Sequence, residues 1–164
     1  MIFGMTPFTF VHVVISLVGI GSGFVVVYGF LTAKRLDFWT GIFLATTVLT
    51  SVTGFVLPFE HFMPSHAVGI LSLVVLTAAI VARYALHLAG IWRRIYVVSA
   101  VVALYLNVFV LIAQLFQKVE TLRALAPNQF EPPFLLTQLV VLVLFFGIGI
   151  AATLKFRAMP IRLA

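Results

Sequence analysis

Five long runs of apolar residues follow one another along the chain, separated by short polar stretches. They cover 8–31, 38–57, 67–88, 95–116 and 134–154. None contains an acidic residue, and Arg83 is the one strong cation inside them. A bilayer core about 30 Å thick is crossed by about 20 apolar residues in a helix. The pattern therefore predicts an all-α, polytopic membrane protein: one domain, 1–164, forming a bundle of five transmembrane helices.

Composition agrees with this class. Hydrophobic residues make up 63% of the chain and charged residues 9%, whereas soluble domains hold roughly 45–50% apolar residues. An outer-membrane barrel would show short alternating segments, and these runs are continuous. A secretory signal peptide is not expected, because the first lysine, Lys34, follows the first run instead of preceding it.

The distribution of lysine and arginine predicts how the bundle is oriented. One side holds seven of these residues and the other side two: Lys34, Arg35, Arg93, Arg94, Lys155, Arg157 and Arg162 against Lys118 and Arg123. Because cytoplasmic loops carry the excess of positive charge, we expect the N-terminus outside and the C-terminus in the cytoplasm. The segments 58–66 and 117–133 are then external loops, and the second is expected to form a short helix over the bundle.

This charge pattern also limits the partners. The net charge of +6 is explained by the lysines and arginines that set the topology. Nucleic-acid binding is not expected, because the sequence contains no soluble module with a basic face. The chain has no cysteine, which excludes disulfides and thiolate metal sites. Arg83 and His87 lie near the cytoplasmic end of the third run, where we expect them to reach lipid phosphates and anchor the helix.

Small and polar residues inside the runs predict how the helices pack. Gly19 and Gly23 are four residues apart in "GIGSG", a spacing that lets helix backbones approach closely. Thr46, Thr50 and Thr53 form a stripe on the second run, for which packing is the favoured interpretation. For Asn107, near the middle of the fourth run, we expect an interhelical hydrogen bond, since a buried amide needs a partner.

Ionisable and amide side chains gather toward the outer side. The segment "PFEHFMPSHAVGI", residues 58–70, brings Glu60, His61 and His66 together between two apolar runs. His12 lies at a similar depth within the first run, where an imidazole is costly without a partner. We therefore expect an outer polar cavity, roofed by 117–133. Its predicted lining residues are His12, His66, Gln114 and Gln138.

Several uses of this cavity remain open. His12 and His66 could be axial ligands of haem b, with Lys118 or Arg123 neutralising its propionates. A quinone is a second redox ligand that such a site could hold. Glu60, His61 and His66 could instead bind a divalent metal ion such as zinc or copper.

Three other interpretations compete with a redox ligand. The histidines could be ordinary polar residues at a membrane interface. A transporter or channel is less favoured, because no acidic residue lies inside any run. A structural or assembly subunit would use its small-residue faces to bind other membrane subunits or further copies of itself. No hydrolytic set is visible, so an enzymatic role would be that of a membrane oxidoreductase.

The stretch "GIWRRIYVVSAVVALYLNVFVLIAQLF", followed by "LAPNQFEPPF", resembles a group of small uncharacterised bacterial inner-membrane proteins. The resemblance covers most of the chain. It implies a multi-pass location in the bacterial cytoplasmic membrane, with the lipid bilayer as surroundings, and no particular activity. More distantly, outer histidines on a small apolar bundle are similar to membrane cytochromes of the b561 type. Those usually have two histidine pairs or a clearer four-span pattern, and this sequence departs from both.

Overall fold

The computed structural model describes residues 6–56 and 64–156, and they are helical throughout apart from the turns, with no strand among them. The helices are α1 (Pro7–Leu31), α2 (Asp37–Gly54), α3 (Pro64–Ile80), α4 (Ile91–Lys118), α5 (Glu120–Leu125) and α6 (Pro132–Lys155). A short π-helix, η1 (Val81–Ala85), continues α3. The all-α prediction is confirmed, and so is the short helix within 117–133.

Four helices are long and apolar enough to cross a membrane. They are α1, α4 and α6, together with the segment His66–Ala85, which spans α3 and η1. The remaining long helix, α2, has 18 residues, begins with Asp37 and carries several hydroxyl side chains. The membrane class is therefore supported by four helices, and a fifth crossing by α2 stays a prediction.

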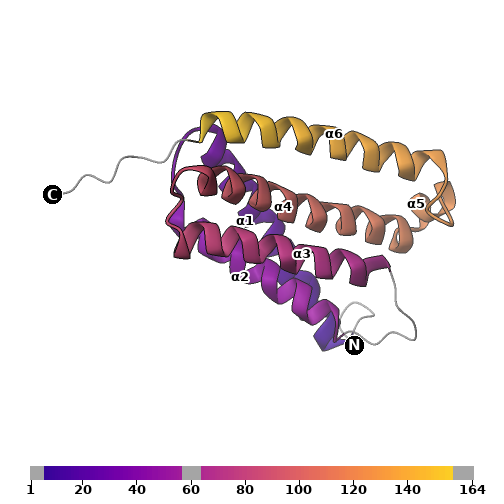
Figure 1. Ribbon diagram of the computed structural model, residues 1–164. Helices are drawn as coiled ribbons and strands as arrows, with labels where there is room; N and C mark the ends of the chain where they lie inside the picture. The colour runs from indigo at the N-terminus through magenta and orange to yellow at the C-terminus, as the bar shows by residue number, and fades with distance from the viewer. Residues whose placement is uncertain (1–5, 57–63, 157–164) are drawn as a thin grey trace.

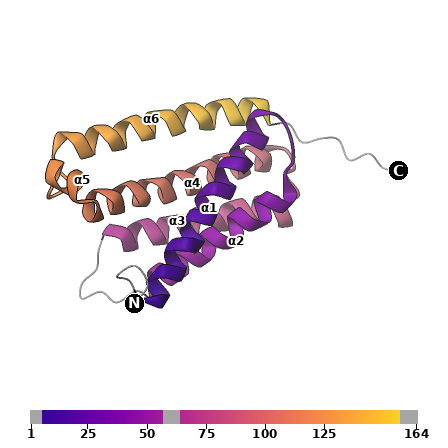
Figure 2. The ribbon, with the colours of Figure 1, turned by 180° about the vertical axis from the view of Figure 1, so that it is seen from behind.

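The long helices run antiparallel, with successive helices joined at opposite ends (Figure 1). Helix α1 packs on α2 and α4, and α3 packs on the same two helices. Helix α6 lies along α4 at the edge, joined to it through α5 (Figure 1). Seen from behind, α1 crosses the other helices at an angle and diverges from α4 toward its own N-terminus (Figure 2).

Close packing at the middle of α1 fixes that crossing point. A Cβ at Gly19 would lie 3.1 Å from Thr46 Oγ1, and one at Gly23 would lie 2.6 Å from Leu104 Cδ1. Phe43 and Leu104, which face Gly23, are 1% and 0% exposed. The predicted role of the two glycines in helix packing is confirmed, because α1 can approach α2 and α4 only where these positions lack side chains.

An irregular turn ends the third helix. Here η1 is followed by His87, Leu88 and Gly90, all with positive φ. The backbone N–H of Leu88 donates to the carbonyl of Ala82 at 2.9 Å, which satisfies one carbonyl that the helix end leaves open. The turn directs the chain back into α4 and places Arg83 between α2 and α4.

Candidate functional site

A cavity of about 410 Å³ lies among α1, α2, α3 and α4, at the end of the bundle where α1 and α3 begin. His12, His66 and Gln114, three of the four residues predicted to line it, do so. Most of the wall surface is apolar, with Ile20 and Val110 contributing to it. We call this space the histidine cavity.

The histidine cavity reaches the apolar outer surface of the bundle between α1 and α4. Leu17 on α1 and Leu115 on α4 both line it, and they are 50% and 41% exposed. Both helices therefore contribute side chains that line the cavity and also face outward. A ligand dissolved in the hydrocarbon region could therefore reach the cavity sideways.

His12 is held in one orientation by α2. Its Nδ1 lies 2.7 Å from the hydroxyl of Thr53. That hydroxyl donates its proton to the carbonyl of Leu49, at 2.6 Å. While this proton stays on that carbonyl, the Thr53 oxygen can take part in the His12 contact only as the acceptor of Nδ1–H. In this tautomer Nε2 carries no proton and presents a lone pair.

His66 enters the cavity from the opposite side, on the first turn of α3. It is 6% exposed, and its ring lies against Phe55 with centroids 5.7 Å apart and planes 30° apart. Gly69 leaves room for Phe55, since a Cβ there would lie 3.1 Å from the end of that ring. The two histidines thus come from helices that flank the cavity without packing closely on each other.

Some of the other polar side chains in the cavity already have a hydrogen-bond partner within the protein, and others do not. Asn107 donates to Thr47 Oγ1 at 3.2 Å, which confirms the predicted interhelical bond. The Thr50 hydroxyl is buried without a partner, and the described residues give the Gln114 amide no hydrogen bond. No carboxylate lines the cavity among the described residues, and Lys118 is the cation at its rim. Such a lining favours a neutral, hydrogen-bonding ligand.

Gln138, the fourth predicted residue, lies elsewhere. Its Nε2 donates to the carbonyl of Phe109 at 3.1 Å, between α4 and α6, and its Oε1 is buried without a partner. It therefore bonds to α4 at Phe109, which does not line the cavity. The expected roof is not seen either, because no described residue beyond Lys118 lines the cavity.

Of the three residues of the predicted metal site, the structure describes only His66. Glu60 and His61 lie outside the described residues, so their position relative to His66 is not given. Within 6–56 and 64–156, no group of three histidine, aspartate or glutamate side chains could hold a metal ion. A site using Glu60, His61 and His66 stays a prediction.

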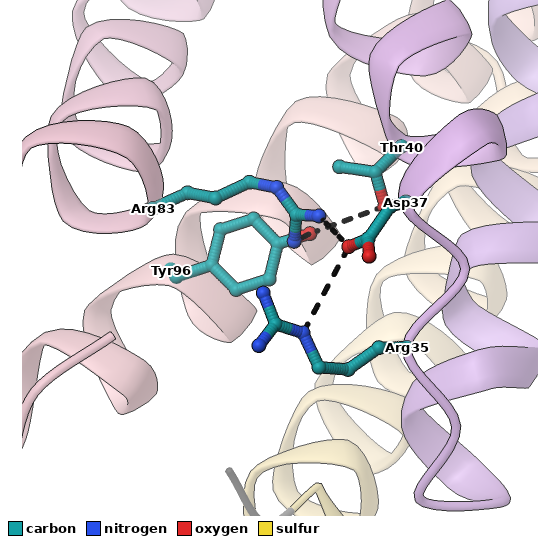
Figure 3. Close-up of polar contacts among 5 residues, drawn as sticks. All are labelled: Arg35, Asp37, Thr40, Arg83 and Tyr96. Carbon is teal, nitrogen blue, oxygen red and sulfur yellow. Dashed lines mark hydrogen bonds and ion pairs between the residues drawn. The ribbon is translucent and has the colours of Figure 1, made fainter. Parts of the chain in front are cut away.

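At the other end of the bundle, Arg83 forms a second polar cluster (Figure 3). Its guanidinium donates to the carboxylate of Asp37 and, at 3.2 Å, to the hydroxyl of Tyr96. The Tyr96 hydroxyl lies 3.4 Å from Thr40 Oγ1, and Arg35 Nε lies 3.8 Å from Asp37. The side chain of Arg83 is 6% exposed. The expectation that it reaches lipid phosphates was wrong, because the buried guanidinium pairs with the carboxylate at the start of α2.

A second cavity, of about 370 Å³, lies between α4 and α6. Its walls are apolar, with Val101, Tyr105 and Phe145 among them. It contains no histidine, amide or charged side chain, so it offers no chemistry comparable to that of the histidine cavity.

Comparisons with protein-family models, curated proteins and solved structures give no match. The function must therefore be inferred from the geometry of the histidine cavity itself.

Proposed function

We propose that this protein is a multi-pass membrane protein whose histidine cavity binds a membrane-soluble redox ligand of the quinone class. The observation that carries the proposal is the mostly apolar cavity, bordered by half-exposed side chains of α1 and α4, which His12 and Gln114 line with polar groups from two helices. Its volume of about 410 Å³ lies within the roughly 300–1,000 Å³ typical of small-molecule and cofactor sites.

The chemistry of a quinone matches this lining in three ways. Its ring is neutral and apolar, as the walls contributed by Ile20, Val110 and Leu111 require. Its two oxygens need polar partners on different sides, which His12 and Gln114 supply. Its lipid tail can leave between Leu17 and Leu115, into the surrounding hydrocarbon.

We place this cavity on the outer side of a bacterial cytoplasmic membrane, with five crossings. The basis is the seven-to-two bias of lysine and arginine, which puts the start of α1 outside. The Asp37–Arg83 pair supports a crossing by α2, since it offsets the charge at the one end of α2 that carries a carboxylate. The protein would then act in electron transfer at the outer surface.

Haem b is a second candidate, favoured by the pair of histidines. His12 on α1 and His66 on α3 line the cavity from different helices, as the two axial ligands of a b-type haem do. A ligating histidine usually has its second nitrogen held by a hydrogen bond, and Thr53 holds Nδ1 of His12 in this way. Lys118 at the rim could pair with a propionate. A haem bound there would supply one-electron transfer.

One preparation distinguishes these candidates. The protein is purified in mild detergent, and its absorption spectrum, iron content and organic extract are measured on the same sample. A quinone site predicts a colourless, iron-free protein whose extract contains quinone in near-stoichiometric amount. A Soret band that shifts on reduction would instead establish haem.

The variant His12→Ala should lose the bound ligand in either case. His87→Asn is the matched control, because His87 is exposed at the other end of the bundle and asparagine tolerates its positive φ of 50°. Wild-type protein that yields neither quinone nor haem, and that binds neither when it is added, would contradict the proposal.

A further inference from the structure

We infer that the histidine cavity recognises the reduced, hydroxyl-bearing form of its ligand, a quinol, in preference to the oxidised quinone. This inference rests on the proposed function and names which redox form the site is built for. It follows from the direction of two hydrogen bonds at Thr53.

The first step is the commitment of the Thr53 proton. Its hydroxyl lies 2.6 Å from the carbonyl of Leu49, one turn earlier in α2, and 3.3 Å from that of Thr50. Threonines within transmembrane helices commonly donate to the carbonyl one turn back. With its proton so engaged, the Thr53 oxygen can only accept from His12 at 2.7 Å.

The second step is the state of the other imidazole nitrogen. Since Nδ1 of His12 carries the proton, Nε2 is a hydrogen-bond acceptor in the neutral ring. A quinone carbonyl placed against Nε2 would set lone pair against lone pair. A quinol hydroxyl placed there donates a hydrogen bond, so the reduced form alone satisfies this nitrogen.

The third step concerns the opposite edge of the ring. Gln114 on α4 has an amide that can either donate or accept, and no described residue engages it. It can serve an oxygen of either redox form, so it does not discriminate between them. Discrimination is therefore assigned to His12, and Thr53 is the positioning residue that sets its tautomer.

Thr53 gives the sharpest test because it does not line the cavity. Thr53→Val keeps the shape of the side chain but removes the acceptor of the His12 proton, so either tautomer becomes available. The matched control is Thr77→Val on α3, where an exposed hydroxyl likewise donates to the carbonyl one turn back, at 2.8 Å.

The experiment measures binding of a decyl-tailed benzoquinol and of the corresponding benzoquinone by the purified protein in detergent, without oxygen. We expect the wild type and Thr77→Val to bind the quinol about tenfold more tightly, as an unsatisfied acceptor against a carbonyl implies. Thr53→Val should bind both forms with a ratio near one. Thermal unfolding of each variant without ligand reports whether the fold is intact.

Each outcome decides a different point. Equal or tighter binding of the quinone by the wild type overturns the inference while leaving the proposed function standing. An unchanged ratio in Thr53→Val overturns the role of Thr53. Binding of neither form contradicts the proposed function itself. A haem spectrum overturns the inference, because iron and not a quinol would then be the partner of His12 Nε2.

Discussion

The guanidinium of Arg83, at the end of the third helix, donates to the carboxylate of Asp37, at the start of the second (Figure 3). The two partners are unequally buried, since the Arg83 side chain is 6% exposed and that of Asp37 is 66% exposed. The rings of Tyr84 and Tyr96 lie 5.5 and 5.3 Å from the guanidinium. This pair joins α2 to η1 at the end of the bundle opposite the histidine cavity, and the bond from Arg83 to Tyr96 adds α4.

Removing Asp37, the exposed partner, should lower the free energy of unfolding more than removing Arg83, the buried partner. Asp37→Asn leaves a buried arginine without its counter-charge and should destabilise the protein by about 1–2 kcal/mol, below the value for fully buried pairs because Asp37 is exposed. Arg83→Met leaves a solvated carboxylate and should cost less. Unfolding in detergent mixtures measures both free energies, and the double variant should lie close to Arg83→Met. Equal costs for the two single variants would contradict the burial argument.

Gly23 and Gly21 form a matched pair on one helix. A Cβ at Gly23 would lie 2.6 Å from Leu104 and 2.9 Å from Phe43, whereas one at Gly21 would meet nothing within 4 Å. Gly23→Ala should destabilise the fold by about 1–3 kcal/mol through overpacking. Gly21→Ala should be neutral or slightly stabilising, since alanine favours helix. Thermal unfolding of the two variants tests the packing of α1, and a reversed order would show that α1 does not cross at Gly23.

The loop before α6 should respond to acid through Glu131. Desolvation raises the pKa of this carboxyl, but hydrogen bonds together lower the pKa below its ordinary value; they come from the backbone N–H groups of its own residue, Asn128 and Phe130 and from the Asn128 side chain. A lowered pKa in the folded state means that Glu131 stabilises the loop above its unfolded pKa. That stabilisation is lost as the pH falls through the lowered value.

Hydrogen exchange at the backbone amides of Phe130 and Asn128 measures this loss of loop stabilisation directly. Once corrected for the intrinsic pH dependence of exchange, their protection should decrease as Glu131 becomes protonated. In Glu131→Gln it should be low and independent of pH over the same range. Equal protection in the two proteins would show that the carboxylate does not order the loop.

The absence of cysteine makes the topology measurable with single-cysteine variants. Lys34→Cys, Ala89→Cys and Ala124→Cys place a thiol at exposed positions in three different connections. If α2 crosses the membrane, a membrane-impermeant maleimide added outside intact cells should label Ala124→Cys alone. Labelling of Lys34→Cys from outside would contradict the charge bias and the orientation drawn from it.

The level of a side chain along the length of the bundle could be predicted from sequence, but its direction around its helix could not. His12, His66 and Gln114 were placed at one depth, and all three line one cavity. Gln138 was placed there too, yet it bonds to the carbonyl of Phe109. The apolar runs are hydrophobic on every side, so nothing in their periodicity says which face of α6 turns toward α4.

Long-range pairing was the second feature hidden from sequence reasoning. Arg83 and Asp37 are 46 residues apart, and Asp37 precedes the apolar run assigned to its helix. The hydrogen-bond partner of His12 Nδ1 is likewise distant, since Thr53 is 41 residues away. By contrast, the partner of Asn107 was expected to come from another helix, because a buried amide must be satisfied wherever the helices place it.

Photochemical labelling with a quinone tests the central claim most directly, because it reports where the ligand sits. The purified protein is illuminated with an azide-bearing benzoquinone, and the labelled peptides are identified by mass spectrometry. We predict attachment to α1 near Leu17 and to α4 near Leu111 and Leu115, abolished by excess unlabelled quinol and reduced in His12→Ala. Attachment confined to the apolar cavity between α4 and α6, around Tyr105 and Phe145, would contradict the assignment of the histidine cavity as the binding site.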